Sequence, residues 1–441
     1  MRNTSDRRGA VLRVLATGTV VAGLIAGLAG CGGDSYYTYT APNSVVVADF
    51  NGNGYNDVAI ANAYIDQTSS TEQPGYVSLA MQNTSSPGTF AATVHFATDG
   101  DPSAMAVGDI AGGGSVDLAV ANYNKGTISV LLETSPKSGT FQKQISVPTG
   151  GAYPNDVAIC DVNGDGLADL VVANGNYNGG SVLWIPQTAA GQFGSPVTIG
   201  AMPTDTGDGA TVPDPAYGVA CGNLNGDGHS MDVVVTSWYE DLTTGDVYGA
   251  SGKVSVFLHD PNNPGSFLPR IDYEVQGIVH RVVIADMNQD GMLDIVVSNE
   301  GVGSDAIGAP GANILLQNTA AGATTPTFAT PVTVTTDSAV SLAVGDLNGD
   351  GMPDIVIASG YENADAVEVV FNQTTKGSST LSFSSVTPYT GLGNPSSVAI
   401  GDLNHDGLPD IASADGTGAV IYFQQTGAGA GTFVQGLEIG S

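Results

Sequence analysis

The chain has 441 residues, with 11 Lys and Arg against 43 Asp and Glu, and its formal net charge is -32 at pH 7. Only 12% of its residues are charged and 42% are hydrophobic, with 61 Gly and 22 Pro, which excludes a disordered acidic chain and favours short strands joined by tight turns. Nucleic acid is excluded as a partner, because phosphate binding depends on clustered Lys and Arg.

Residues 1–30 are predicted to be an export signal. A basic start precedes an apolar run that is too short and too rich in Gly for a spanning helix, and the run ends at Leu28-Ala29-Gly30 before Cys31. This end resembles the lipobox of bacterial lipoproteins, and an ordinary secretory peptide is the alternative. We expect cleavage before Cys31, lipidation of that residue, and a lipid anchor that holds the protein on the bacterial cell envelope. Residues 31–37 would form a short tether.

A nine-residue pattern then recurs seven times. In full form it reads Asp-x-Asn-x-Asp-Gly-x-x-Asp, and its copies begin at Asp49, Asp109, Asp161, Asn223, Asp286, Asp346 and Asp402. Short β-branched runs flank each copy, as at 282–285 and 295–297, and indicate two strands joined by the pattern. A third strand follows, and a fourth follows a Phe that we expect to pack one repeat against another. This Phe recurs as Phe90, Phe141, Phe193, Phe267, Phe328, Phe383 and Phe433.

Seven units of four strands, without an amphipathic helical stretch, predict an all-β fold, a seven-bladed β-propeller over residues 38–441. The repeats resemble the FG-GAP/VCBS repeats of bacterial surface proteins and of the integrin α-subunit propeller. The resemblance covers about residues 38 to 441, although the Gly-Ala-Pro element of integrins is poorly kept. The position of the last Phe also predicts that the ring closes between the last and first blades without strand exchange.

The repeated loops offer hard oxygen ligands at alternating positions, and their Gly permits a tight turn. This combination suits Ca²⁺, which accepts six to eight oxygens in flexible geometry. An EF-hand is excluded because Val172, Val297, Ile357 and Ser413 occupy the place of its Glu. The four complete loops are predicted to bind Ca²⁺ through Asp161, Asn163, Asp165, Asp169, Asp286, Asn288, Asp290, Asp294, Asp346, Asn348, Asp350, Asp354, Asp402, Asn404, Asp406 and Asp410.

The other three loops are predicted to be weaker. The first has one carboxylate fewer, and its ligands would be Asp49, Asn51, Asn53 and Asp57. The second has Ala111 and Gly113 where ligands belong and should be empty, while the fourth begins with Asn223 and carries one extra residue before Asp232. For any single loop, an Asx-rich turn without metal is the alternative.

Two further Cys, Cys160 and Cys221, lie one and two residues before their loops in neighbouring repeats. They either face each other across a blade interface or point apart, and free core thiols are the simpler expectation.

The face opposite the calcium loops is the predicted binding surface. Its candidate ligand-binding residues are Tyr217, Trp238, Tyr239, His280 and Arg281, which do not recur between repeats. Recurrent Asn and Tyr beside them, such as Asn62 and Asn122, are interpreted mainly as residues that fix the loops.

No nucleophile elbow, phosphate loop or paired metal-ligating His is found in the sequence. We therefore expect a non-enzymatic, calcium-stabilised extracellular binding or adhesion propeller that recognises a protein or glycan partner. A carbohydrate-active enzyme, a polysaccharide lyase or hydrolase on the same scaffold, is the alternative, and it rests on fold analogy.

Overall fold

The computed structural model describes residues 38–66, 75–151, 153–175, 179–205, 212–228, 231–239, 251–301, 309–319, 325–360, 365–390, 393–416, 418–424 and 431–440. The predicted signal, the tether and Cys31 lie outside the described residues. Within the described ranges, no helix is long and apolar enough to cross a membrane.

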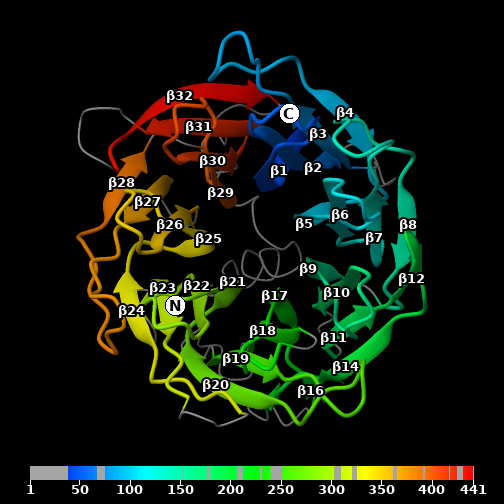
Figure 1. Cartoon of the computed structure of the whole chain (residues 1–441), viewed down its shortest axis with the longest axis vertical. Helices are drawn as coiled ribbons and strands as arrows, with labels where there is room; N and C mark the ends of the chain where they lie inside the picture. Colours follow the sequence, from blue (N-terminus) through cyan, green and yellow to red (C-terminus); the bar gives the residue numbers. More distant parts are fainter. Residues whose placement is uncertain are drawn as a thin grey trace, which may run out of the picture.

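Seven four-stranded antiparallel sheets are arranged as blades around a central axis (Figure 1). The prediction of a seven-bladed β-propeller is therefore confirmed. Blade 1 comprises β1 (Thr38–Ala48), β2 (Asp57–Asp66), β3 (Tyr76–Ala80) and β4 (Val94–Ala97). Blade 2 comprises β5 (Pro102–Gly108), β6 (Asp117–Asn122), β7 (Thr127–Leu131) and β8 (Ile145–Pro148). Blade 3 comprises β9 (Pro154–Cys160), β10 (Asp169–Asn174), β11 (Ser181–Ile185) and β14 (Val197–Ala201).

The remaining blades follow the same order. Blade 4 comprises β17 (Ala216–Gly222), β18 (Asp232–Tyr239), β19 (Ser251–Phe257) and β20 (Ile271–Gln276). Blade 5 comprises β21 (Val279–Ala285), β22 (Asp294–Asn299), β23 (Gly311–Leu315) and β24 (Val332–Thr335). Blade 6 comprises β25 (Ala339–Gly345), β26 (Asp354–Ser359), β27 (Ala366–Val370) and β28 (Thr387–Thr390). Blade 7 comprises β29 (Ser397–Gly401), β30 (Asp410–Asp415), β31 (Gly418–Gln424) and β32 (Phe433–Gly440).

Two short hairpins lie outside the blades, formed by β12 (Gln187–Ala189) with β13 (Gln192–Phe193), and by β15 (Thr204–Asp205) with β16 (Val212–Pro213).

The second strand of each blade explains the β-branched runs of the sequence. All six residues of β6, β10, β22, β26 and β30 are buried. Such strands have a neighbouring blade on both faces, so both sets of alternating side chains are apolar.

The hydrophobic core is divided into seven clusters, one at each junction between blades. The recurrent Phe of every blade belongs to the cluster that the blade shares with the preceding one. Phe328 of blade 5, for example, packs with Leu224 and Val234 of blade 4. The expectation that these Phe residues pack blade against blade is confirmed.

The ring closes by side-by-side packing of blades 1 and 7. Val45 and Val58 of blade 1 share a core cluster with Ala412 and Ile421 of blade 7. The Val45 N–H donates to Ser397 Oγ at 3.3 Å. All four strands of blade 7 come from the C-terminal end of the chain, so closure without strand exchange is confirmed.

The expectation of free core thiols is wrong. Cys160 and Cys221 form a disulfide between β9 of blade 3 and β17 of blade 4, with their Cα atoms 6.4 Å apart. This separation lies within the usual range for a disulfide. The two innermost strands of these blades are therefore covalently joined beside their loops.

Candidate functional site

The seven loops of the sequence pattern each join the first strand of a blade to its second. Their last Asp is the best-defined member, because in every blade it is fully buried. In blade 5, one oxygen of Asp294 accepts the N–H of Met287 at 2.8 Å, and the other accepts the N–H of Gln317 at 2.8 Å. The same pair of hydrogen bonds recurs in all seven blades, so this Asp fastens the loop to the end of the third strand.

Burial controls the ionisation of the last Asp in four of these loops. Loss of solvation raises the pKa of Asp294 and Asp410 to about 7, and that of Asp57 and Asp354 to about 6. The main-chain N–H donors oppose this rise, and the carboxylates of the same loop add to it. These groups are costly to ionise unless a cation is nearby.

The first, third and fifth positions turn their oxygens toward the loop's own main chain. Asp286 Oδ1 and Asn288 Oδ1 both accept the N–H of Asp290 at 3.1 Å, and Asp286 Oδ2 accepts the N–H of Gly291 at 2.9 Å. Asp290 Oδ1 accepts the N–H of Met292 at 2.8 Å. The complete loops of blades 3, 6 and 7 repeat this arrangement.

The donor set of the complete loops fits a hard cation. Each loop gathers one half-buried carboxylate, one exposed carboxylate, one amide oxygen and one fully buried carboxylate within a single turn. In the described part of the chain, however, no three His, Cys, Asp or Glu side chains converge closely enough to hold a metal ion by themselves. Ca²⁺ in these loops would therefore also need the Asn oxygen and main-chain carbonyls, which it accepts readily.

The incomplete loop of blade 2 is filled by a hydroxyl group. Ser115 Oγ lies 2.8 Å from Asp109 Oδ1 and 2.9 Å from Asp117 Oδ2, so it bridges the two remaining carboxylates. The side chains at 111 and 113 are a methyl group and a hydrogen atom and supply no ligand. The prediction that this loop is empty of metal stays a prediction, and Ser115 gives it a physical basis.

Loops and blades are also linked by a residue that the sequence reasoning missed. At the end of the third strand, each blade has a Gln, Asn, Glu or His, which is the second residue past the strand in blades 1 to 6 and the last residue of β31 in blade 7. In four blades its amide group donates to the main-chain carbonyl at the second loop position of the preceding blade. These donors are Gln187, Gln317, Asn372 and Gln424, at 2.6–3.1 Å. The signal that could have found it is the recurrence of Gln or Asn six to eleven residues before the Phe in five of the seven blades.

On the opposite face, the starts of the first strands bring most of the predicted ligand-binding residues together. The Tyr217 ring stacks on Trp238 with centroids 5.3 Å apart, and it also meets the His280 ring edge-on with centroids 5.7 Å apart. His280 Nε2 lies 2.7 Å from Glu300 Oε2. Trp238 is 8% exposed, which makes it part of the core between blades 4 and 5 and not an open surface. The side chain of Tyr239 lies outside the described residues.

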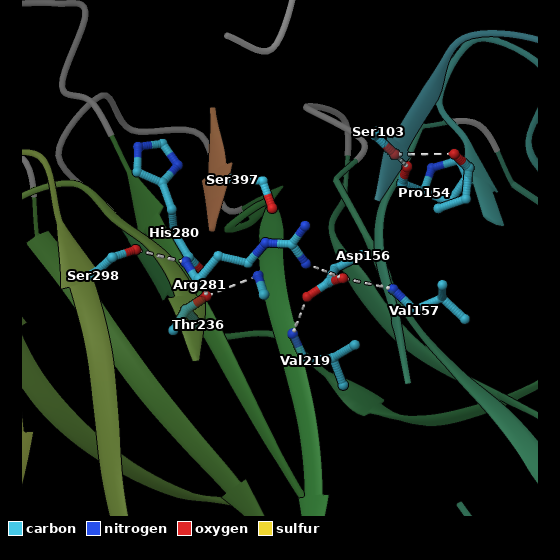
Figure 2. Close-up of polar contacts among 12 residues, drawn as sticks. Ser103, Pro154, Asp156, Val157, Val219, Thr236, His280, Arg281, Ser298 and Ser397 are labelled. Carbon is cyan, nitrogen blue, oxygen red and sulfur yellow. Dashed lines mark hydrogen bonds and ion pairs between the residues drawn. The ribbon is translucent and has the colours of Figure 1, made fainter. Parts of the chain in front are cut away.

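Arg281 reaches across blade 4 from blade 5. Its guanidinium donates to Asp156 Oδ1 of blade 3, while Asp156 Oδ2 accepts the N–H of Val219 from blade 4 at 3.1 Å (Figure 2). The His280 ring points to the other side of the strand, as alternation requires (Figure 2). Tyr217, His280, Arg281, Asp156 and Glu300 thus gather at one rim of the ring, which we call the polar rim.

The recurrent Asn residues near this rim are structural. Asn62 and Asn122 are fully buried and donate to the hydroxyl groups of Ser78 and Ser129, at 3.0 and 2.9 Å. These contacts join the second strand to the third and support a structural role for both residues. Among tyrosines, burial raises the pKa of Tyr273 and Tyr422, both of which pack inside junction clusters, so neither favours the enzymatic alternative.

Comparisons with known proteins agree with the repeat pattern. An FG-GAP-like repeat family matches residues 110–172 and 346–413, and the FG-GAP repeat matches residues 41–79. Human integrin alpha-7 is 36% identical over 104 residues, which cover 20% of this chain and 8% of the integrin. The rat protein of the same name is 35% identical over 104 residues, covering 20% and 9%. The chain therefore matches less than a tenth of the length of these relatives.

Two solved structures share the fold. One is a putative 6-phosphogluconolactonase from Bacteroides uniformis ATCC 8492, with a TM-score of 0.56, 14% identity, and coverage of 87% of this chain and 97% of the other. The second is Saccharomyces cerevisiae Sqt1, with a TM-score of 0.50, 12% identity, and coverage of 92% and 88%. At these identities the similarity concerns the fold alone.

Proposed function

We propose that this FG-GAP repeat protein is a non-enzymatic binding propeller, stabilised by Ca²⁺ in its loops and displayed on a bacterial envelope. Its partner would be an extracellular protein or glycan. Asp161, Asp286, Asp346 and Asp402, with the Asn and Asp that follow them in each loop, would hold the Ca²⁺, which supplies positive charge among the loop carboxylates. Binding of the ion to the folded state would stabilise the ring.

The observation that carries the binding function is the polar rim. Tyr217, His280 and Arg281 do not recur in other blades, yet the fold brings them to one place. The side chains of His280 and Arg281 are 18% and 24% exposed. Aromatic rings beside charged and polar groups are typical of protein hot spots and of sugar-binding surfaces.

A glycan and envelope-protein array, run with and without Ca²⁺, would identify partners. The key variant is Asp156→Asn combined with Arg281→Gln, which removes the ion pair without leaving a buried carboxylate unpaired. We expect at least tenfold weaker binding to the identified partner, measured well below the melting temperature of the double variant so that both proteins are folded. Lys376→Ala, an exposed residue of the loop between β27 and β28, is the matched control. Equal affinity of wild type and the double variant would contradict the proposal.

A further inference from the structure

The loop of blade 1 differs from the complete loops at its fifth position, where Asn53 stands in place of Asp. The loop still folds in the common way, because the Asn53 N–H donates to Asp49 Oδ1 at 3.0 Å and to Asn51 Oδ1 at 3.1 Å. Asn53 is exposed, and the next residue is Gly54, with a φ of 88° and no atom within 4 Å of where a Cβ would stand. An amide group thus lies beside an unhindered main-chain nitrogen, at the position where four other loops have a carboxylate.

Two hydrogen bonds around Asn53 match what the cyclisation of an Asn side chain requires. In this reaction the main-chain nitrogen of the following residue attacks the side-chain carbonyl carbon, so the nitrogen must lose its proton and the carbonyl oxygen gains negative charge. The Gly54 N–H donates to Asp49 Oδ2 at 2.8 Å, which places a carboxylate where a base is needed. Asn53 Oδ1 accepts the N–H of Tyr55 at 2.8 Å, so a fixed donor faces the oxygen on which charge develops.

The Asn residues at the third position of two complete loops provide an internal comparison. Asn163 and Asn348 also precede Gly, and the first Asp of each loop accepts that Gly N–H. Both Asn residues are half-buried, however, and their Nδ2 groups donate to Asp165 Oδ2 and Asp350 Oδ2 at 3.0 Å. These bonds hold the group that must leave and keep negative charge beside the carbonyl carbon. Within the described residues, Asn53 Nδ2 makes no such hydrogen bond.

We propose that the blade 1 loop completes its own ligand set by deamidation of Asn53. The Gly54 nitrogen bonds to Asn53 Cγ while its proton passes through Asp49 to Nδ2, the Cγ–Nδ2 bond breaks, and ammonia leaves behind a five-membered succinimide. Water then adds to Cγ, which the Tyr55 N–H polarises, and the bond between Cγ and the Gly54 nitrogen breaks as that nitrogen regains a proton. The product is Asp at position 53.

The product loop has the Asp, Asn, Asp and Asp of the complete loops. An added carboxylate strengthens Ca²⁺ binding in a loop of oxygen ligands. This consequence rests on the calcium function proposed above, whereas the covalent change does not depend on it. The two are therefore measured separately.

The direct test compares the folded chain with the unfolded chain. Fresh protein is incubated in EDTA, either folded by circular dichroism or unfolded in urea, and peptide mapping by mass spectrometry follows each Asn and separates aspartate from isoaspartate. We expect Asn53 to convert several-fold faster in the folded chain, mainly to Asp, and Asn163 and Asn348 to convert more slowly there than in urea. A folded-state rate at Asn53 no higher than the rate in urea, or isoaspartate as its main product, would overturn the proposal.

A variant of the base gives a second test. Asp49→Asn should slow the conversion of Asn53 roughly tenfold or more, because the Gly54 nitrogen loses its proton acceptor. Asp109→Asn changes the same position of the blade 2 loop and should leave the rate at Asn53 unchanged. An equal or higher rate in Asp49→Asn would mean that Asn53 reacts only as an exposed Asn-Gly pair, and would overturn the proposal.

The effect on metal binding is measured with Asn53→Asp, which supplies the product directly. Tb³⁺ takes the place of Ca²⁺ among oxygen ligands, and its luminescence excited through Tyr55 reports on this loop, with Tyr55→Phe in both backgrounds as the blank. We expect Asn53→Asp to reach half-saturation at a roughly tenfold lower Tb³⁺ concentration than fresh wild type. Equal titrations, with Ca²⁺ bound elsewhere in the ring, would overturn completion of the ligand set. Absence of Ca²⁺ binding in every loop would instead refute the calcium function.

Discussion

The disulfide occupies a contact that the other junctions make with aliphatic residues. A small residue just before one loop faces a β-branched residue two positions before the next loop. A Cβ atom built on Gly108 would lie 3.1 Å from Ile159 Cγ2, and one on Gly222 would lie 3.2 Å from Ile284 Cδ1. Cys160 and Cys221 hold these two positions at the junction of blades 3 and 4. Their one-residue offset in the sequence is therefore what this pairing requires.

Replacing both Cys by Ser should lower the free energy of unfolding by about 2–4 kcal/mol, since the bond closes a long loop in the unfolded chain. A matched variant, Cys160→Gly with Cys221→Ile, restores the aliphatic contact of the neighbouring junctions. We expect it to recover part of the loss, as measured by thermal melting under oxidising conditions. If the two double variants melt together, the aliphatic contact contributes nothing at this junction.

The buried carboxyls predict how stability depends on pH in metal-free protein. Burial raises the pKa of Asp294 and Asp410 to about 7, well above the ordinary value of 3.8. Folding therefore favours the protonated form: the stabilisation is complete below pH 3.8 and is lost as the pH rises through about 7. We expect the melting temperature in EDTA to fall between pH 5 and pH 8, and Ca²⁺ to raise it more at pH 8.

One control variant accompanies this pH series. Asp410→Asn removes one titrating group and should flatten the slope in EDTA. A melting temperature in EDTA that stays constant or rises from pH 5 to pH 8 would show that the burial of these carboxyls does not control stability.

At the scale of the loop, different positions have separable tasks. The last Asp accepts two main-chain N–H groups, whereas the exposed fifth Asp accepts one and directs its second oxygen to the Asn288 amide. Asp294→Asn would place an NH₂ group against a buried N–H, which should cost roughly 2 kcal/mol with or without Ca²⁺. Asp290→Asn should have little effect in EDTA but should weaken the stabilisation by Ca²⁺. Melting curves of both variants under both conditions test this division.

The result that would contradict this division is a loss of stability in Asp294→Asn that appears only when Ca²⁺ is present. The buried Asp would then contribute to stability only as a Ca²⁺ ligand and not by accepting the two main-chain N–H groups.

Much of each blade could be predicted from the sequence, because loop, strands and Phe recur in register. The spacing places a carboxylate at the ninth position, but it does not show that one N–H donor from the loop and another from the end of the third strand converge there. Trp238 illustrates another limit. Its ring packs on Tyr217 at the start of the neighbouring strand β17, and the sequence does not show whether the ring faces that strand or solvent. Arg281 and Asp156 are 125 residues apart, so their pairing emerges only when three blades stand side by side.

For the whole molecule, the ring was predictable because each blade can cover its apolar faces only with neighbouring blades. Neighbouring blades are linked at their junctions, where the main-chain carbonyl at the second loop position of one blade accepts a hydrogen bond from the next blade. The Leu224, Met287 and Leu347 carbonyls accept amide hydrogen bonds from Gln317, Asn372 and Gln424 at 3.0, 2.7 and 2.6 Å. A loop that loses its conformation would therefore also lose a hydrogen bond to the following blade.

Calcium removal should therefore affect the ring unevenly. Complete loops lie in blades 5, 6 and 7 in succession, and the amide hydrogen bonds connect these blades, whereas Ser115 closes the loop of blade 2 without metal. We expect amide hydrogen exchange after EDTA treatment to rise at least tenfold in residues 286–294, 346–354 and 402–410, and at the ends of β27 and β31. Residues 109–117 should change little. Equal loss of protection in blade 2 and in blades 5 to 7 would show that calcium does not act through these loops.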